Sequence, residues 1–417
     1  MTIHKGFLIT ILIILFSAGE AISQGAPLQR AFVKRLQYLD TLKQSQLYKS
    51  AYVATPFIVS GIILYTPGKR FQDIRNGFTP DFNHRADDYI QYLPTAMLYG
   101  MRVAGVKGRS SWGRLLTTHA LSAVTMAVLV NGIKYTVKEE RPDNSAHNGF
   151  PSGHTALAFM SANMVHHEYG LTRSPWYSIG AYSIATATAV IRVLNDKHYL
   201  QDALFGAGIG ILSTELGYYF SDLIFKKSGL LLIDKNYSYS DNEKPGSFIG
   251  MTLGFNKTLN LIPVTSTVNL KSTWGTSSGI EGAWYLNRNW GIGGSLTANS
   301  SPTQVVRGNF RFSGPHINWF TISAGPNYSY PVTRTGRFGG KIAVGYTGLM
   351  ENSFNGYTIT TSKGLSLSGG IFAEQHITQG LFFKLYSNME KTFFNQSKYN
   401  FLNLVTGASV NIDLGVL

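Results

Sequence analysis

The chain has 417 residues, which is more than one ordinary domain needs, so two domains are expected. It contains no cysteine, and this excludes disulfides and thiolate metal sites. The net charge is +14, but only 14% of the residues are charged and no run of Lys and Arg forms a basic arm. This composition argues against a nucleic-acid partner and favours a phosphate-rich partner or a membrane surface.

Residues 1–23 have the features of an export signal. Lys5 supplies the positive start, "GFLITILIILF" forms the apolar core, and "AIS" at 21–23 offers a small-residue cleavage site. A membrane anchor is the alternative, but the apolar core is short for a membrane span. We therefore expect residues 1–23 to be a signal peptide.

Long apolar stretches characterise the chain up to residue 232. Each is long enough for a buried helix, and Pro56, His119, Glu215 and many Ser, Thr and Gly residues dilute their apolar character. Their polar content leaves open whether they span a bilayer. We expect a compact helical domain over residues 24–232, with helices near residues 51–66, 118–133, 174–191 and 203–220.

After a polar linker at 233–245, the hydrophobic period changes to two. Near the C-terminus, Leu385 and Met389 fall on one face of a strand while Lys384 and Glu390 fall on the other. "NRN" at 287–289 joins two such runs as a tight hairpin. We expect strands near residues 247–255, 278–286, 290–298, 317–325, 340–349, 366–374, 381–389 and 402–414.

These runs of alternating residues predict a membrane barrel over residues 246–417. A soluble β-sandwich would show the same alternation, but the many Gly and aromatic residues, the strand length and the regular spacing favour a barrel with apolar residues outside. The runs predict about eight strands. Residues 261–272 and 304–312 could add one more pair. The expected fold is thus multi-domain, with an all-α helical bundle followed by an all-β antiparallel barrel.

The stretch "NGFPSGHTALAF" at 148–159 predicts a helix start that attracts anions. Ser152 is a good N-cap, and a helix follows from Thr155 onward. Free backbone amides and the positive end of the helix dipole meet there, and Gly153 lets a ligand approach the backbone closely. Taken alone, this pattern is usually only a cap.

Other charged residues beside the apolar stretches complete a candidate phosphate site. Lys134 and Arg141 lie at the end of one apolar helix, and Arg192 lies at the end of another. His198 and Asp202 are four residues apart, so on a helix they would share a face and the carboxylate would orient the imidazole. Each residue singly has a structural interpretation. Together, three cations, an amide-rich helix start and two histidines suit a phosphoryl group.

The pattern K-x6-R-P, P-S-G-H, S-R-x5-H-x3-D resembles the type 2 phosphatidic acid phosphatases, a superfamily that includes bacterial acid phosphatases and vanadium haloperoxidases. The resemblance covers residues from about 50 to 230 and departs at one position, where Ile191 replaces the serine before the third-motif arginine. It implies a helical-bundle phosphatase that uses no metal and no other cofactor. His198 would be the nucleophile, Asp202 its orienting group and His154 the general acid. The implied phosphate-binding residues are Lys134, Arg141, Ser152, Gly153 and Arg192.

The remaining histidines are poor catalytic candidates. His119 lies in an apolar run, and His147, His166 and His167 fall outside the motif spacing. Histidine is a common metal ligand, but the side chains of the adjacent pair His166 and His167 diverge on a helix. Only Glu168 is a carboxylate at ligand spacing.

Fusion of such a domain to a barrel resembles Bacteroidetes-type outer-membrane proteins. It implies an outer-membrane location with the phosphatase domain in the periplasm. The expected substrate is a membrane lipid phosphate, with lipid A favoured over phospholipid and polyprenyl phosphates. Two alternatives remain, a vanadium haloperoxidase-like enzyme and a non-enzymatic barrel or porin with a degenerate helical domain. The oligomeric state is open.

Overall fold

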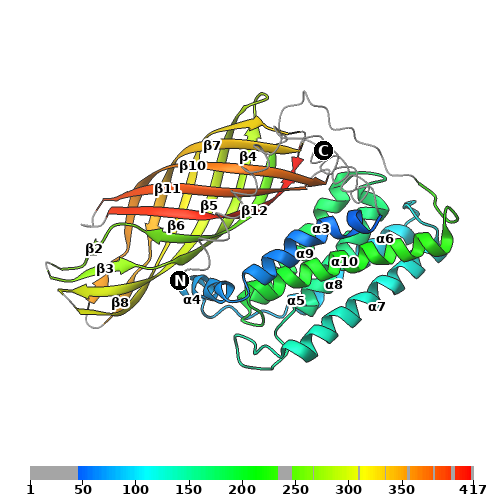
Figure 1. Cartoon of the computed structure of the whole chain (residues 1–417), viewed down its shortest axis with the longest axis horizontal. Helices are drawn as coiled ribbons and strands as arrows, with labels where there is room; N and C mark the ends of the chain where they lie inside the picture. The colour runs from blue at the N-terminus through cyan, green and yellow to red at the C-terminus, as the bar shows by residue number, and fades with distance from the viewer. Residues whose placement is uncertain are drawn as a thin grey trace, which may run out of the picture. The chain divides into compact units, whose positions relative to one another are not determined.

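A computed structural model describes residues 46–232 and 247–414, apart from 266, 309, 334, 355–356, 379–380 and 396–399. The expected signal peptide (1–23) and linker (233–245) lie outside the described residues. Helices occupy the first part and strands the second, as Figure 1 shows. The expected order, an all-α part followed by an all-β part, is confirmed.

The helices form where the long apolar stretches predicted them, in α3, α7, α9 and α10, and α8 begins directly after Ser152. The apolar pattern of the sequence did not predict the shorter helices between α3 and α7. The helical elements are α3 (Gln46–Ile63), η2 (Pro67–Phe71), α4 (Gln72–Phe78), α5 (Asp87–Ile90), α6 (Leu93–Val103), α7 (Trp112–Val137), α8 (Gly153–Val165), the π-helix η3 (His166–Gly170), α9 (Pro175–Leu194) and α10 (Leu200–Phe225).

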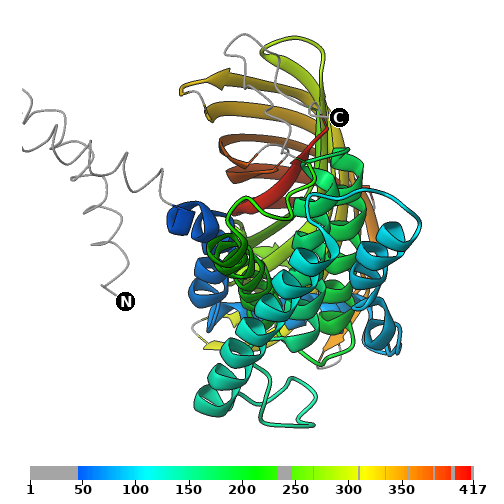
Figure 2. The ribbon, with the colours of Figure 1, turned by 90° about the vertical axis from the view of Figure 1, so that its right-hand side faces the viewer.

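Helix α8 forms the centre of the helical part. Its residues are buried on nearly all sides, and α7, α9 and α10 pack around it, as the two views in Figures 1 and 2 show. Gly206 and Gly210 of α10 face the carbonyls of Ser152 and Ala156 so closely that a Cβ atom would collide with them. The close approach of α8 and α10 therefore holds their first turns together, where the candidate site lies.

In the described part of the chain two helices, α7 and α9, are long and apolar enough to cross a membrane, by length and composition alone. In α7 the apolar side chains of Val124 and Val128 are exposed, with 63% and 65% of their surface accessible. These exposed apolar side chains suit contact with a lipid surface.

Eight strands of the described residues close into an antiparallel ring. Each strand of the ring pairs with the ring strand that precedes it and with the one that follows it in the chain. The first strand, β1, also pairs with the last, β12, and this closes the ring: Phe248 lies opposite Asp413, and Thr258 lies opposite Asn403. The ring strands are β1 (Phe248–Thr258), β4 (Gly275–Tyr285), β5 (Trp290–Arg307), β6 (Phe310–Pro331), β7 (Gly336–Leu349), β10 (Ser362–Thr378), β11 (Leu381–Phe394) and β12 (Asn400–Asp413). All eight expected strands are present.

The two additional stretches do not widen the ring. Residues 261–272 hold only the short strands β2 (Ile262–Pro263) and β3 (Asn269–Ser272), and β3 pairs with the end of β5. Residues 304–312 continue β5 and begin β6. A second short pair, β8 (Asn352–Phe354) and β9 (Tyr357–Ile359), follows β7.

The ring is apolar outside, and its inside is polar in the middle with clusters of buried apolar side chains towards the two ends. Ile342 and Leu385 are 61% and 63% exposed on the outer face. Inside, the carboxylate of Glu281 lies 2.6 Å from Lys384 Nζ and accepts a hydrogen bond of 2.7 Å from Ser409. A soluble sandwich would have open sheet edges and a polar outer face, so the closed ring with its apolar outer face confirms the barrel.

This closed barrel predicts heat-modifiable migration on gels. Every ring strand is paired on both sides, so detergent finds no open edge to attack at room temperature. We expect unheated samples to migrate differently from boiled ones, and membrane fractionation to place the protein in the outer membrane. Recovery only in the inner membrane, with no heat-dependent shift, would contradict this.

Candidate active site

The structure gathers the predicted residues where four helix ends meet, the last turns of α7 and α9 and the starts of α8 and α10. Hydrogen bonds between the connecting segments hold them there, from Ser152 N to Asp202 O at 3.0 Å and from Asp143 N to Asp196 O at 3.1 Å. The candidates are Lys134 in the last turn of α7, Arg141 in the following loop, Ser152, Gly153 and His154 at the start of α8, Arg192 in the last turn of α9, and His198 and Asp202 at the start of α10.

Ser152 occupies the N-cap of α8 but does not cap it with its side chain. Its hydroxyl instead accepts a hydrogen bond of 3.0 Å from the Thr155 hydroxyl. The expected position is therefore right, and the expected capping bond is not formed. Since the first amides of a helix have no intrahelical acceptor, those of Gly153, His154 and Thr155 are suited to an anion.

His198 and Asp202 form a buried pair, with Nδ1 of the histidine 3.5 Å from Oδ2 of the carboxylate. The expectation that both lie on one helix was wrong, because α10 begins at Leu200 and His198 precedes it. The pair forms because Asp202 Oδ2 also accepts the Tyr199 amide at 2.9 Å in a capping box. The cap thus points the carboxylate back at the imidazole.

The environment of His198 keeps its imidazole neutral. Burial lowers the pKa of His198 well below its ordinary value, and the charges of Arg192, Lys134 and Arg141 lower it further. A neutral imidazole whose Nδ1 faces a carboxylate has its Nε2 lone pair available. The arrangement therefore suits a nucleophile.

Asp202 experiences the opposite shift. Burial, with the nearby charge of Glu139, raises the pKa of Asp202 to about 8. Glu139 is itself buried and forms an ion pair of 2.7 Å with Lys69 of η2, whose ammonium lies 5.0 Å from the ring centre of Tyr199. A second carboxylate therefore lies beside the His198–Asp202 pair and makes ionisation of Asp202 costly.

This cost predicts that Asp202→Asn stabilises the helical part. The pKa of Asp202 is higher in the folded chain than its ordinary value of 3.8, so the stability due to its proton is complete below about pH 4 and is lost as pH rises through about 8. We expect the variant to unfold at a higher temperature than wild type at pH 9. Each kcal/mol gained in the free energy of unfolding should raise the Tm by about 2–4 °C. Thermal unfolding in detergent at pH 5 and pH 9 measures this. A variant less stable at pH 9 than wild type would contradict it.

Two of the three cations are held by different partners. Lys134 donates to the carbonyl of Asn148, and Arg192 donates to Asp87 Oδ2 at 2.7 Å. Within the described residues, the buried Nε atoms of Arg141 and Arg192 have no hydrogen-bond partner. These N–H groups are donors that an oxyanion can satisfy.

His154 lies at the more open side of the site, with 32% of its side chain exposed. Its Nε2 is 3.4 Å from Asp88 Oδ1. Burial and Arg192 lower the pKa of His154, while Asp88 and Asp87 oppose that shift. The carboxylate therefore favours the protonated form that a general acid needs.

Sequence reasoning missed four residues of this environment, namely Asp87, Asp88, Glu139 and Lys69. Asp87 and Asp88 come from α5, about 100 residues before Arg192, and no motif spacing connects them. The adjacent acidic pair "DD" at 87–88 and the "KEERP" run at 138–142 were the only signals.

The other histidines lie elsewhere. His119 contacts Tyr99 OH at 2.5 Å, and His166 contacts Ser178 Oγ at 2.8 Å. His167 pairs with Glu215 at 2.7 Å, a carboxylate that sequence spacing did not suggest. No group of three or more His, Asp or Glu side chains suited to a metal occurs in the described part of the chain.

Comparison with known families defines the class of the helical part. Residues 114–225 match the PAP2 superfamily. The matched range runs from α7 to α10 and contains all eight candidate residues. The chain therefore carries a PAP2 domain followed by a β-barrel.

A more specific likeness is to the lipid A 1-phosphatase of Porphyromonas gingivalis, 41% identical over 172 residues. The match covers 41% of this chain and 38% of that protein, so the chain spans well under half of its relative. Among solved structures, Aquifex aeolicus LpxE is 19% identical with a TM-score of 0.28, covering 35% of this chain and 92% of that one. Yersinia pestis Ail is 14% identical with a TM-score of 0.28, covering 40% of this chain and 99% of that one.

Proposed function

We propose that this protein is a metal-independent phosphatase that hydrolyses phosphate esters or pyrophosphates of membrane lipids, with lipid A as the favoured substrate. The observation that carries the proposal is the convergence of two buried guanidinium Nε donors, the first amides of α8 and a neutral buried His198. Donors of this number suit the oxygens of one phosphoryl group. The likeness to a lipid A 1-phosphatase supports the lipid class.

In the first half of the reaction, Nε2 of His198 attacks phosphorus. A P–N bond forms as the bond to the leaving oxygen breaks, and His154 gives its proton to that oxygen. Lys134, Arg141 and Arg192 neutralise the charge that gathers on the three phosphoryl oxygens, with the amides of Gly153, His154 and Thr155 at the start of α8 beside them. As the imidazole becomes cationic, its charge lowers the cost of ionising Asp202, and the ionised carboxylate 3.5 Å away stabilises the cation.

In the second half, water replaces the histidine. His154, now neutral, takes a proton from the water molecule as its oxygen bonds to phosphorus, and the P–N bond breaks. Phosphate leaves and His198 returns to its neutral state. No metal or other cofactor enters either half of this scheme.

We further propose that residues 24–232 act in the periplasm while residues 246–417 hold them at the outer membrane. A signal peptide at 1–23 and a linker at 233–245 fit that arrangement. The apolar surface of α7 supports a position close to lipid.

Phosphate release by the purified chain tests the proposal. The panel contains lipid A, phosphatidic acid, phosphatidylglycerol phosphate and undecaprenyl pyrophosphate. We expect release from lipid A to be the fastest. Release from none of the four, by protein with an intact heat-modifiable barrel, would favour a non-enzymatic barrel with a degenerate helical domain.

Vanadate should inhibit more strongly than phosphate. It adopts the trigonal-bipyramidal geometry of phosphoryl transfer, and a site built for that geometry binds it more tightly. Chelators should leave phosphate release unchanged. Activity that is lost in EDTA and returns with a divalent ion would contradict the metal-free mechanism.

Phosphate release, measured beside halide oxidation, distinguishes the phosphatase from the haloperoxidase alternative. The same residues would then hold vanadate as a cofactor, with His198 as its ligand. Phosphate release without added vanadate, together with no oxidation of halide by hydrogen peroxide when vanadate is present, would exclude that alternative.

A further inference from the structure

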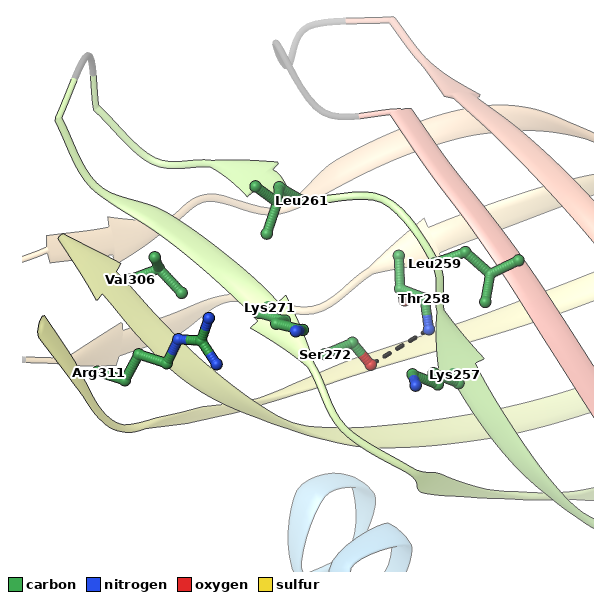
Figure 3. A pocket seen from close by; sticks show the side chains of 8 residues that line it. All are labelled: Lys257, Thr258, Leu259, Leu261, Lys271, Ser272, Val306 and Arg311. Carbon is green, nitrogen blue, oxygen red and sulfur yellow. Dashed lines mark hydrogen bonds between the residues drawn. The ribbon is translucent and has the colours of Figure 1, made fainter. Parts of the chain in front are cut away.

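A cavity of about 380 Å³ lies on the barrel, away from the candidate active site. Figure 3 shows its lining, which comes from the end of β1, from β3 and from the hairpin of β5 and β6. Three of the lining side chains are basic, Lys257, Lys271 and Arg311. The apolar part of the lining includes Leu259, Leu261 and Val306.

The strand registers place the three cations on the outer wall. Lys257 lies between Asn256 and Thr258, which are buried inside the ring, so it points outward. On β5, Val305 is buried inside and its neighbours Gln304 and Val306 point outward. Lys271 pairs with Gln304 and Arg311 pairs with Val306, and paired residues share a face.

The protein brings a carboxylate to the stretch 303–316, where Asp73 of α4 lies 3.7 Å from His316, but in the described residues it pairs no carboxylate with the cations of this cavity. Within the described residues none of the three cations forms an ion pair, although Lys257 lies 5.7 Å from the ring centre of Trp274. The stretches 257–274 and 303–316 also carry Arg307 and contain no Asp or Glu. The cavity therefore attracts anions.

The outer wall of a membrane barrel faces lipid, where an unpaired cation is costly except at headgroup level. Leu259 and Leu261 are 48% and 49% exposed beside these cations, and Trp274 is 39% exposed. Apolar, aromatic and basic side chains at one level are typical of the membrane interface. The anion that fits is therefore one attached to acyl chains.

The cavity lies at the end of the barrel opposite Phe248 and Asp413, which are the first and last residues of the ring strands. Phe248 and Asp413 mark one end, with the short turns at 286–289 and 332–335. The other end carries the longer connections at 259–274 and 350–361. Outer-membrane barrels have short periplasmic turns and longer extracellular loops. This rule places the cavity at the extracellular leaflet.

We propose that this cavity binds a phosphate-bearing lipid of the outer leaflet. The three cations contact its phosphate groups, and Leu259, Leu261 and Val306 contact the adjoining part of its acyl chains. The site is separate from the PAP2 domain and does not depend on the proposed function.

Binding of bisphosphorylated lipid A to the full chain in detergent tests the site, with vanadate saturating the candidate active site. The variant Lys257→Gln/Lys271→Gln removes two cavity charges. Its control, Lys363→Gln/Lys391→Gln, removes two exposed outward lysines from the same barrel end that do not line the cavity. We expect the Kd to rise about tenfold or more in the cavity variant and to stay within about twofold in the control.

Three results would overturn the proposal. They are equal Kd values for the two variants, equal binding of lipid A without its phosphates, and competition by inorganic phosphate at the concentration of the lipid. The first would mean that the cavity does not bind, the second that acyl chains alone bind, and the third that it is a site for a free anion. Arg311→Gln, at an exposed strand position, provides an independent variant should the double variant lose heat-modifiable migration. If the cavity variant binds lipid A more weakly but releases phosphate at the wild-type rate, the cavity and the proposed active site are independent sites.

Discussion

Replacing His198 with alanine is expected to abolish phosphate release from every substrate. If His198 forms the bond to phosphorus, no phosphoenzyme forms without it, whatever the leaving group. The loss should reach about 10⁴-fold or more in kcat/KM. The measurement is kcat/KM on lipid A and on p-nitrophenyl phosphate, an ester whose leaving group needs no proton.

A folding defect must be separated from this loss. His198 is buried, so its removal leaves a space beside Asp202. Heat-modifiable migration and the thermal unfolding of the helical part report on folding. His147→Ala, an exposed histidine in the loop before α8, provides the matched control and should keep wild-type activity. Residual turnover of the activated ester alone by His198→Ala would assign the nucleophile to another group.

Replacing His154 with alanine is expected to give a loss that depends on the leaving group. As general acid, His154 matters where the leaving oxygen is a sugar or alkyl alcohol, and there its loss should cost about 10²- to 10⁴-fold. Nitrophenolate leaves without a proton, so the variant should keep far more activity on p-nitrophenyl phosphate than on lipid A. The ratio of kcat/KM values for the two substrates is the measurement.

A purely structural role for His154 predicts a different outcome. It lies in the first turn of α8, so damage to the helix start would lower turnover of both substrates equally. Asp88→Asn adds a second measurement, because Asp88 favours protonated His154 from 3.4 Å away. We expect it to shift the alkaline limb of the lipid A pH profile to lower pH while leaving the helix start intact. Equal losses in His154→Ala would mean that the acid is wrongly assigned.

The extent to which sequence predicted the fold differs between the two halves. Apolar length located α3, α7, α9 and α10, since a long uncharged stretch has few alternatives to a buried helix. Alternation located all eight ring strands, because inward and outward positions along each strand differ in polarity. Short elements such as α4 and α5 carry too few residues for a periodic signal.

Sequence by itself determined which residues are candidates for the chemistry, because the three motifs lie close to the ends of helices that the apolar pattern predicts. It also determined the polar inside and apolar outside of the barrel. Only the tertiary structure decided what surrounds these residues. Glu139 beside Asp202, Asp87 on Arg192 and Asp88 near His154 are distant or unmarked in the chain, and they meet there because helix packing brings the segments together. Closure of the ring by β1 and β12, and the gathering of Lys257, Lys271 and Arg311 at one cavity, likewise depend on strand register, which alternation alone does not specify.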